Sequence, residues 1–131
     1  MTGIEWVVDA YGCSAPRLRD VPTLRALFAR LISDLDLHPC GDAQWTQFAG
    51  AGGVTGVQVL SESHLACHSF PEHGTLCLNL FCCRPRPDWD FERFLRTHVG
   101  AATVTVRRLE RLLVPADRPH ALGVEKGDAR P

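Results

Sequence analysis

The stretch VLSESHLACHSFPEHGTLCLNLFCC, residues 59–83, decides the fold. Residues 64–70 and 75–83 are predicted strands, and Pro71-Glu72-His73-Gly74 between them is a turn sequence. The first sixteen residues also hold three histidines, two glutamates, three serines and a cysteine. That is more reactive chemistry than a strand hairpin needs, so the same stretch is the first candidate for a functional site.

The flanking segments extend this hairpin into a strand and helix pattern. Residues 4–12, 43–50, 53–61 and 102–114 are predicted strands. A helix is predicted from Pro22 to Leu35 by apolar residues three and four apart, with His38-Pro39 closing it. Asp88 is the expected N-cap of a second helix, whose inward side carries Trp89, Phe91, Phe94 and Leu95. The order predicts an α+β fold, a two-layer sandwich of a mainly antiparallel sheet with two helices on one face.

Length and charge bound the function classes. The 131 residues suggest one domain over 1–114 and a loose C-terminal tail over 115–131, where proline, glycine and charge dominate. The net charge is −1 and the sequence contains no basic stripe, so a nucleic-acid partner is not expected. No apolar run is long enough for a membrane span, and the N-terminus lacks a signal-peptide profile. These features predict a cytoplasmic protein.

The six cysteines are expected to be reduced thiols, because no export signal accompanies them. Cys13, Cys40 and Cys77 are predicted to be small buried hydrophobic residues. A metal site using Cys67 with His64, His68 and His73 lacks a second ligand cluster, so none is predicted.

Three interpretations of the reactive stretch remain. Its polar residues could simply be solvated. A hydrolase could use Ser63 or Cys83 with a histidine base, although no nucleophile elbow is present. In the third interpretation, Ser63 attacks the Glu62 carbonyl, and elimination then cleaves the chain and leaves a pyruvoyl group. Thr55 and His68 are candidates for the hydroxyl donor and the base that this cleavage requires.

The segment GGVTGVQVLSESHLACHSFPEHG with the following FCC resembles the bacterial S-adenosylmethionine decarboxylase family. The family's usual pattern is close to GVSGVxxLxESHxxxHTWPExG followed by DxFTC. This resemblance implies a self-processing, homodimeric α+β enzyme of polyamine biosynthesis, with active sites close to the subunit interface. Its cofactor would be a pyruvoyl group derived from Ser63, which forms a Schiff base with the amine of S-adenosylmethionine.

The resemblance also implies roles for individual residues. Cleavage would occur between Glu62 and Ser63, with His68 as the processing base and Thr55 assisting. Cys83 would reprotonate the product carbon. The substrate would be contacted by Glu72, through its ribose hydroxyls, and by Phe48 and Leu65.

The sequence departs from the family pattern at four places. Asn79 replaces an aspartate, Phe70 a tryptophan and Cys82 a threonine. Phe48 lies one residue further from Thr55 than usual, across FAGAGG. The alternatives are therefore an ornithine or arginine decarboxylase of the same fold, with Glu72 or Asp42 receiving the basic group, or a non-enzymatic homologue. The sheet's second face also carries apolar residues, and a second subunit could cover it.

Overall fold

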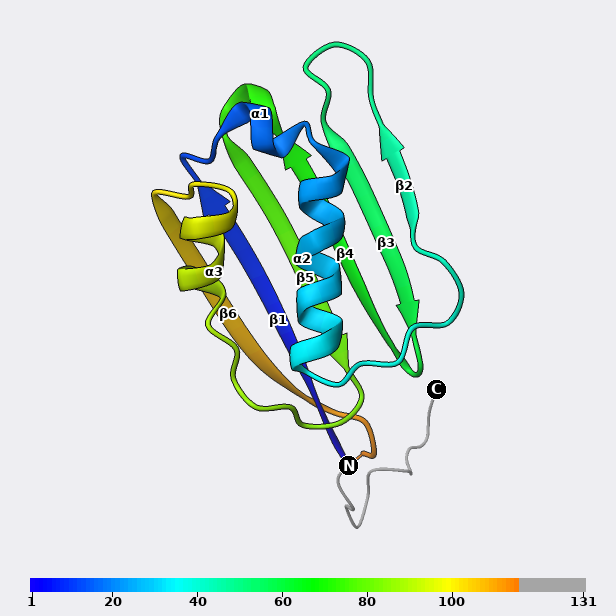
Figure 1. Ribbon diagram of the computed structural model, residues 1–131. Coiled ribbons are helices and arrows are strands. Elements are labelled where there is room, and N and C mark those ends of the chain that lie inside the picture. Colours follow the sequence, from blue (N-terminus) through cyan, green and yellow to red (C-terminus); the bar gives the residue numbers. More distant parts are fainter. Residues whose placement is uncertain (116–131) are drawn as a thin grey trace, which may run out of the picture.

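The computed structural model describes residues 1–115, which form a six-stranded, fully antiparallel sheet. The strand order is β2-β3-β4-β5-β1-β6, and Figure 1 shows the helices lying across one face of it. The predicted α+β two-layer class is confirmed. The strands are β1 (Thr2–Tyr11), β2 (Gln44–Gln47), β3 (Val54–Leu60), β4 (Ser63–Phe70), β5 (Thr75–Cys82) and β6 (Thr103–Leu112). The helices are α1 (Ala15–Leu18), α2 (Val21–Asp34), the 3-10 turn η1 (Pro71–His73) and α3 (Phe91–His98).

Helix α2 packs its predicted apolar face onto the sheet. Its first turn is capped by Asp20, whose carboxylate accepts a hydrogen bond from the Thr23 backbone N–H at 3.1 Å. Leu24, Leu27, Phe28 and Leu31 are buried. The preceding short helix α1 was not predicted, because four residues are too few to show a helical period.

The second predicted helix begins two residues later than expected. Asp90, not Asp88, is the N-cap of α3, and its Oδ1 accepts from the Arg93 backbone N–H at 3.0 Å. This start places Phe91 and Leu95 one turn apart on the buried side. Asp88 instead forms an exposed ion pair with Arg108.

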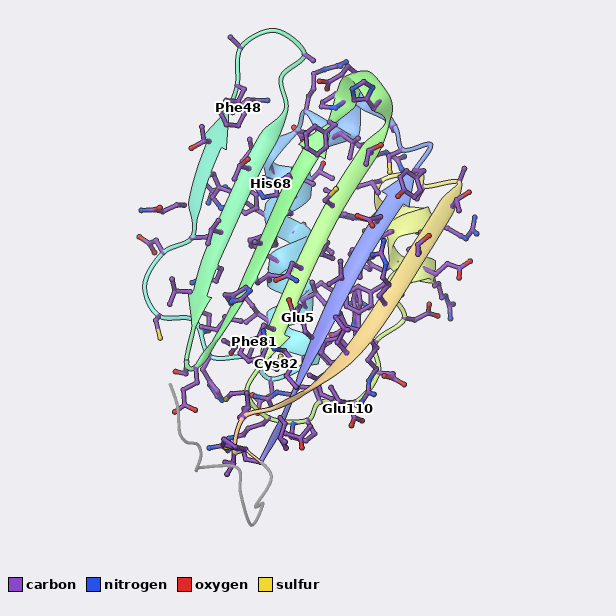
Figure 2. The ribbon with its side chains drawn as sticks, turned by 180° about the vertical axis from the view of Figure 1, so that it is seen from behind. Glu5, Phe48, His68, Phe81, Cys82 and Glu110 are labelled. Carbon is purple, nitrogen blue, oxygen red and sulfur yellow. The ribbon has the colours of Figure 1, made fainter. Side chains whose placement is uncertain are left out.

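The sheet face opposite the helices is uncovered in the single chain, and we call it the open face (Figure 2). In β4 the even-numbered residues point to this face while Leu65, Cys67 and Ser69 are buried against the helices. Several open-face residues are apolar and exposed, among them Val57, Val59, Phe70 and Leu109. The need for a cover therefore follows from the structure as it did from the sequence.

All six cysteines are unpaired, as predicted. Cys13 is buried, but the prediction was wrong for Cys40, which is exposed in the link between α2 and β2, and Cys77 is only half-buried. No helix of the described part is long and apolar enough to cross a membrane. Of the predicted tail, 116–131 lies outside the described residues.

Candidate active site

The Glu62–Ser63 bond lies in the tight turn that joins β3 to β4. Leu60 pairs with Ser63, so the turn itself holds only Ser61 and Glu62. Glu62 has a positive φ of 56°, a left-handed conformation that a residue with a side chain adopts at an energetic cost. The Ser63 hydroxyl donates to the Ser61 carbonyl at 3.0 Å. The bond predicted to break thus follows the one residue of this hairpin with a left-handed backbone.

Cys83 lies beside the same turn, just past the end of β5. Its thiol donates to Glu62 Oε1 at 3.3 Å. The pKa of the Cys83 thiol is raised, mainly by partial burial. The hydrogen bond to Glu62 and the negative charge of that carboxylate raise it further. The group therefore keeps its proton at neutral pH, as a proton donor should. We call Glu62, Ser63 and Cys83 the hairpin cluster.

Thr55 and His68 face each other further along the same pair of strands. They are register partners of β3 and β4, and Thr55 Oγ1 lies 2.9 Å from His68 Nδ1. Both line a cavity of about 240 Å³, together with Phe48 and Glu72. We call Phe48, Thr55, His68 and Glu72 the cavity cluster.

The glycine-rich loop accommodates the extra residue between Phe48 and Thr55. Gly50 and Gly52 both have φ of 81°, and the Phe48 N–H closes the loop by donating to the Gly53 carbonyl at 2.8 Å. The side chain of Gln47 donates to the Gly52 carbonyl at 3.2 Å and to the Arg19 carbonyl at 2.6 Å. The ring of Phe48 consequently reaches the cavity despite the unusual spacing.

The two clusters lie at opposite ends of the strands that carry them. Ser63 and His68 are five residues apart on β4, and a strand rises about 3.3 Å per residue, which separates their Cα atoms by roughly 17 Å. Figure 2 shows His68 and Phe48 toward one end of the sheet, and Phe81 and Cys82 near the other. Within one chain, His68 is therefore too far from Ser63 to act on it.

Asn79 belongs to a row of polar side chains that crosses the open face near the hairpin cluster. His64 Nε2 lies 2.8 Å from Asn79 Oδ1, and Asn79 Nδ2 donates to Glu5 Oε2 at 2.8 Å. Glu5 in turn accepts from Arg111 at 3.0 Å. The negative charge that an aspartate would bring to position 79 is thus present one strand away, on Glu5.

The remaining predicted residues lie elsewhere. Leu65 is fully buried toward the helices, so its side chain cannot contact a ligand on the open face. Asp42 is exposed and lines a hollow beside Trp45 and α2, away from both clusters. A hollow of about 650 Å³ between α2 and α3 contains no predicted site residue. Among residues 1–115, no three His, Cys, Asp or Glu side chains gather closely enough to hold a metal ion.

Sequence reasoning gave no role to His64 or Glu5. The Glu-Ser-His triplet is the one signal that pointed to His64. Glu5 carried none, because its contact with Asn79 joins residues 74 positions apart.

Comparisons with known proteins agree with the motif. The model of the family described as S-adenosylmethionine decarboxylase matches residues 4–112. The S-adenosylmethionine decarboxylase proenzyme of Pelotomaculum thermopropionicum is 39% identical over 112 residues, covering 83% of this chain and 86% of that protein. The proenzyme of Moorella thermoacetica is 31% identical over 119 residues, covering 90% and 92%.

The fold has a counterpart among solved structures. The crystal structure of the adenosylmethionine decarboxylase from Aquifex aeolicus superposes with a TM-score of 0.73 at 24% sequence identity. The match covers 88% of this chain and 95% of that one, so it extends over most of both chains.

Proposed function

The chain belongs to the S-adenosylmethionine decarboxylase family, and on that premise we propose that it decarboxylates S-adenosylmethionine with a pyruvoyl group made from its own Ser63. The product is the aminopropyl donor of spermidine synthesis. The observation that carries the proposal is the Glu62–Ser63 bond, held in a constrained turn with the Cys83 thiol beside it. Such a pyruvoyl group supplies a carbonyl that takes up the substrate amine and an acceptor for the electrons left when carbon dioxide departs.

The residues at the turn are suited to form a pyruvoyl group from Ser63. Left-handed strain at a residue with a side chain is worth about 1–3 kcal/mol, and breaking the bond after Glu62 would release it. The Ser63 oxygen attacks the Glu62 carbonyl carbon, and the peptide C–N bond breaks to leave an ester. Loss of the Ser63 α-proton then expels the Glu62 carboxylate. Hydrolysis of the remaining dehydroalanine releases ammonia and leaves the carbonyl.

Removal of the α-proton needs a base, and His68 is that base only if a second copy of the chain provides it. The separation of roughly 17 Å along β4 excludes His68 of the same chain. An antiparallel pairing of two open faces would bring the cavity cluster of one copy against the hairpin cluster of the other. It would also cover the exposed apolar residues of that face, including Val59 and Leu109. We therefore infer a homodimer with two shared sites.

In such a shared site the residues divide the work of turnover. Phe48 offers an exposed ring for the flat adenine, and the Glu72 carboxylate accepts from the ribose hydroxyls. Cys83 donates its proton to the carbon that has lost carbon dioxide. Its raised pKa supports that role, because a thiolate would have no proton to give.

Mixing two inactive variants tests the shared site. Ser63→Ala and His68→Ala are each expected to remain uncleaved when expressed alone. Co-expressed, they form mixed dimers in which one of the two sites has both an intact Ser63 and an intact His68. Intact-mass measurement should then show that the His68→Ala chain is cleaved at the Glu62–Ser63 bond.

A control mixture pairs the Ser63→Ala chain with a second chain that carries both Thr55→Val and His68→Ala. The cavity cluster of the Ser63→Ala chain is complete, so this mixture should also restore cleavage of the double variant. No cleavage in any mixture would refute the shared site. A wild-type chain that stays uncleaved and releases no carbon dioxide from S-adenosylmethionine would refute the enzymatic function itself. Ornithine and arginine, assayed in parallel, are expected to be inert.

A further inference from the structure

The row from His64 to Arg111 has a fixed direction of hydrogen bonding. A carboxylate only accepts hydrogen bonds, so the amide nitrogen of Asn79 must face Glu5. The amide oxygen then faces His64, and it too can only accept. Nε2 of His64 must therefore carry a proton.

The charges of the row are already balanced without a charge on His64. Arg111 holds Glu5 through its guanidinium at 3.0 Å and also lies over the Phe81 ring, 5.0 Å from its centroid. The His64 ring packs against the same Phe81, with centroids 5.7 Å apart. A second proton on His64 would add a positive charge to a row whose carboxylate, Glu5, is already paired with Arg111.

We propose that Asn79 is a positioning residue that holds His64 as a neutral imidazole, with its proton on Nε2 and its lone pair on Nδ1. An aspartate at this position, the usual residue in the resembling family, would meet Glu5 at hydrogen-bond distance. That pair of carboxylates would favour a charged imidazolium on His64. The amide thus replaces an aspartate and imidazolium pair by two neutral groups.

The charge state of His64 matters for the nearby Cys83 thiol. His64 follows Ser63 directly and pairs with Phe81 in the register of β4 and β5. Cys83 is two residues beyond Phe81, on the same face, and Glu62 lies beside it. On the proposed function, a neutral His64 adds no second positive charge to that of Arg84, which already acts to lower the pKa of the Cys83 thiol.

Nitrogen NMR of the histidine side chains tests this assignment directly. In protein labelled with ¹⁵N-histidine at pH 7.5, the His64 signals should show a protonated Nε2 and an unprotonated Nδ1. Loss of those signals in His64→Gln assigns them. The Ser63→Ala chain should give the same pattern, so the result does not depend on cleavage or turnover.

Exchanging the amide for a carboxylate should change that pattern. Asn79→Asp is expected to protonate both nitrogens of His64 at the same pH, and Asn79→Leu to give a mixture of tautomers. Asp9→Asn is the matched control, because it alters the neighbouring Asp9–Arg107 pair on the same face at no contact with His64. A wild-type His64 protonated on Nδ1, or an Asn79→Asp spectrum like that of the wild type, would overturn the proposal.

Discussion

The hairpin cluster and the cavity cluster lie on the same two strands, yet they are built in different ways. The hairpin cluster is fixed by the backbone, since Leu60 and Ser63 pair across a two-residue turn and the link before β2 pairs with Leu60 through Pro39. The cavity cluster depends on a glycine-rich loop that the Gln47 side chain holds in place. On the proposed function, the bond to be cleaved lies in a turn fixed by strand pairing, whereas the aromatic ring expected to receive the substrate lies beside a glycine-rich loop.

The largest expected effect concerns the rigid end. Ser63→Ala should abolish cleavage completely, because no hydroxyl remains to attack the Glu62 carbonyl. Intact mass should show one chain that does not react with carbonyl reagents. Ser61→Ala, in the same turn, keeps the backbone carbonyl that Ser63 contacts and should still be cleaved. Cleavage of Ser63→Ala at this bond would remove the basis of the mechanism.

Cys83→Ala should separate the two activities of the hairpin cluster. Cleavage should proceed, because the thiol takes no part in breaking the bond. Turnover should fall by about 10²-fold or more, the scale on which a positioned proton donor contributes. Cys82→Ala is the control, since that neighbouring thiol is buried toward the helices. A Cys83→Ala enzyme with unchanged carbon dioxide release would exclude the thiol as the donor.

A smaller effect is expected at the cavity end. Stacking of a base on an aromatic ring is worth about 1–3 kcal/mol, so Phe48→Ala should raise KM roughly tenfold and leave cleavage intact. Steady-state kinetics with S-adenosylmethionine measures it. Phe94→Ala removes a ring from the α2/α3 hollow instead and should leave KM unchanged. Equal KM for wild type and Phe48→Ala would place the adenine elsewhere.

The smallest effect concerns the reactivity of the Cys83 thiol. The Glu62 carboxylate contributes to the raised pKa of Cys83, so Glu62→Gln should lower that pKa toward its ordinary value. More thiolate is then present at pH 8, and iodoacetamide should label Cys83 severalfold faster. Labelling of the exposed Cys40 serves as the internal reference. An unchanged ratio of the two rates would show that the carboxylate does not influence the thiol.

The sequence predicted the central strands because β1, β3, β4 and β5 alternate between a buried and an open side, and that alternation is local. The same local information misplaced the N-cap of α3, since Asp88 and Asp90 both precede the apolar residues and only packing of Phe91 distinguishes them. It also gave His68 the role of base for the Glu62–Ser63 bond without indicating how far apart Ser63 and His68 lie. Residues five positions apart are separated by about 7.5 Å along a helix axis but by roughly 17 Å along an extended strand.

Contacts between distant parts of the chain account for the rest. The partnership of Asn79 with Glu5 depends on β1 lying beside β5, which no spacing in the motif indicates. The burial of Leu65 follows from the alternation of β4, and it could have been deduced once the exposed position of His68 was accepted. The predicted contact of Leu65 with the substrate would therefore have to be made by its backbone.

The position of β1 has a consequence for the two pieces that cleavage produces. The N-terminal piece carries β1, β2 and β3, and the C-terminal piece carries β4, β5 and β6. Because β1 lies between β5 and β6, the pieces are interleaved rather than stacked end to end. Pulling them apart would open three separate strand ladders together. The broken chain should therefore melt in one transition, and neither piece should leave without unfolding of the whole sandwich.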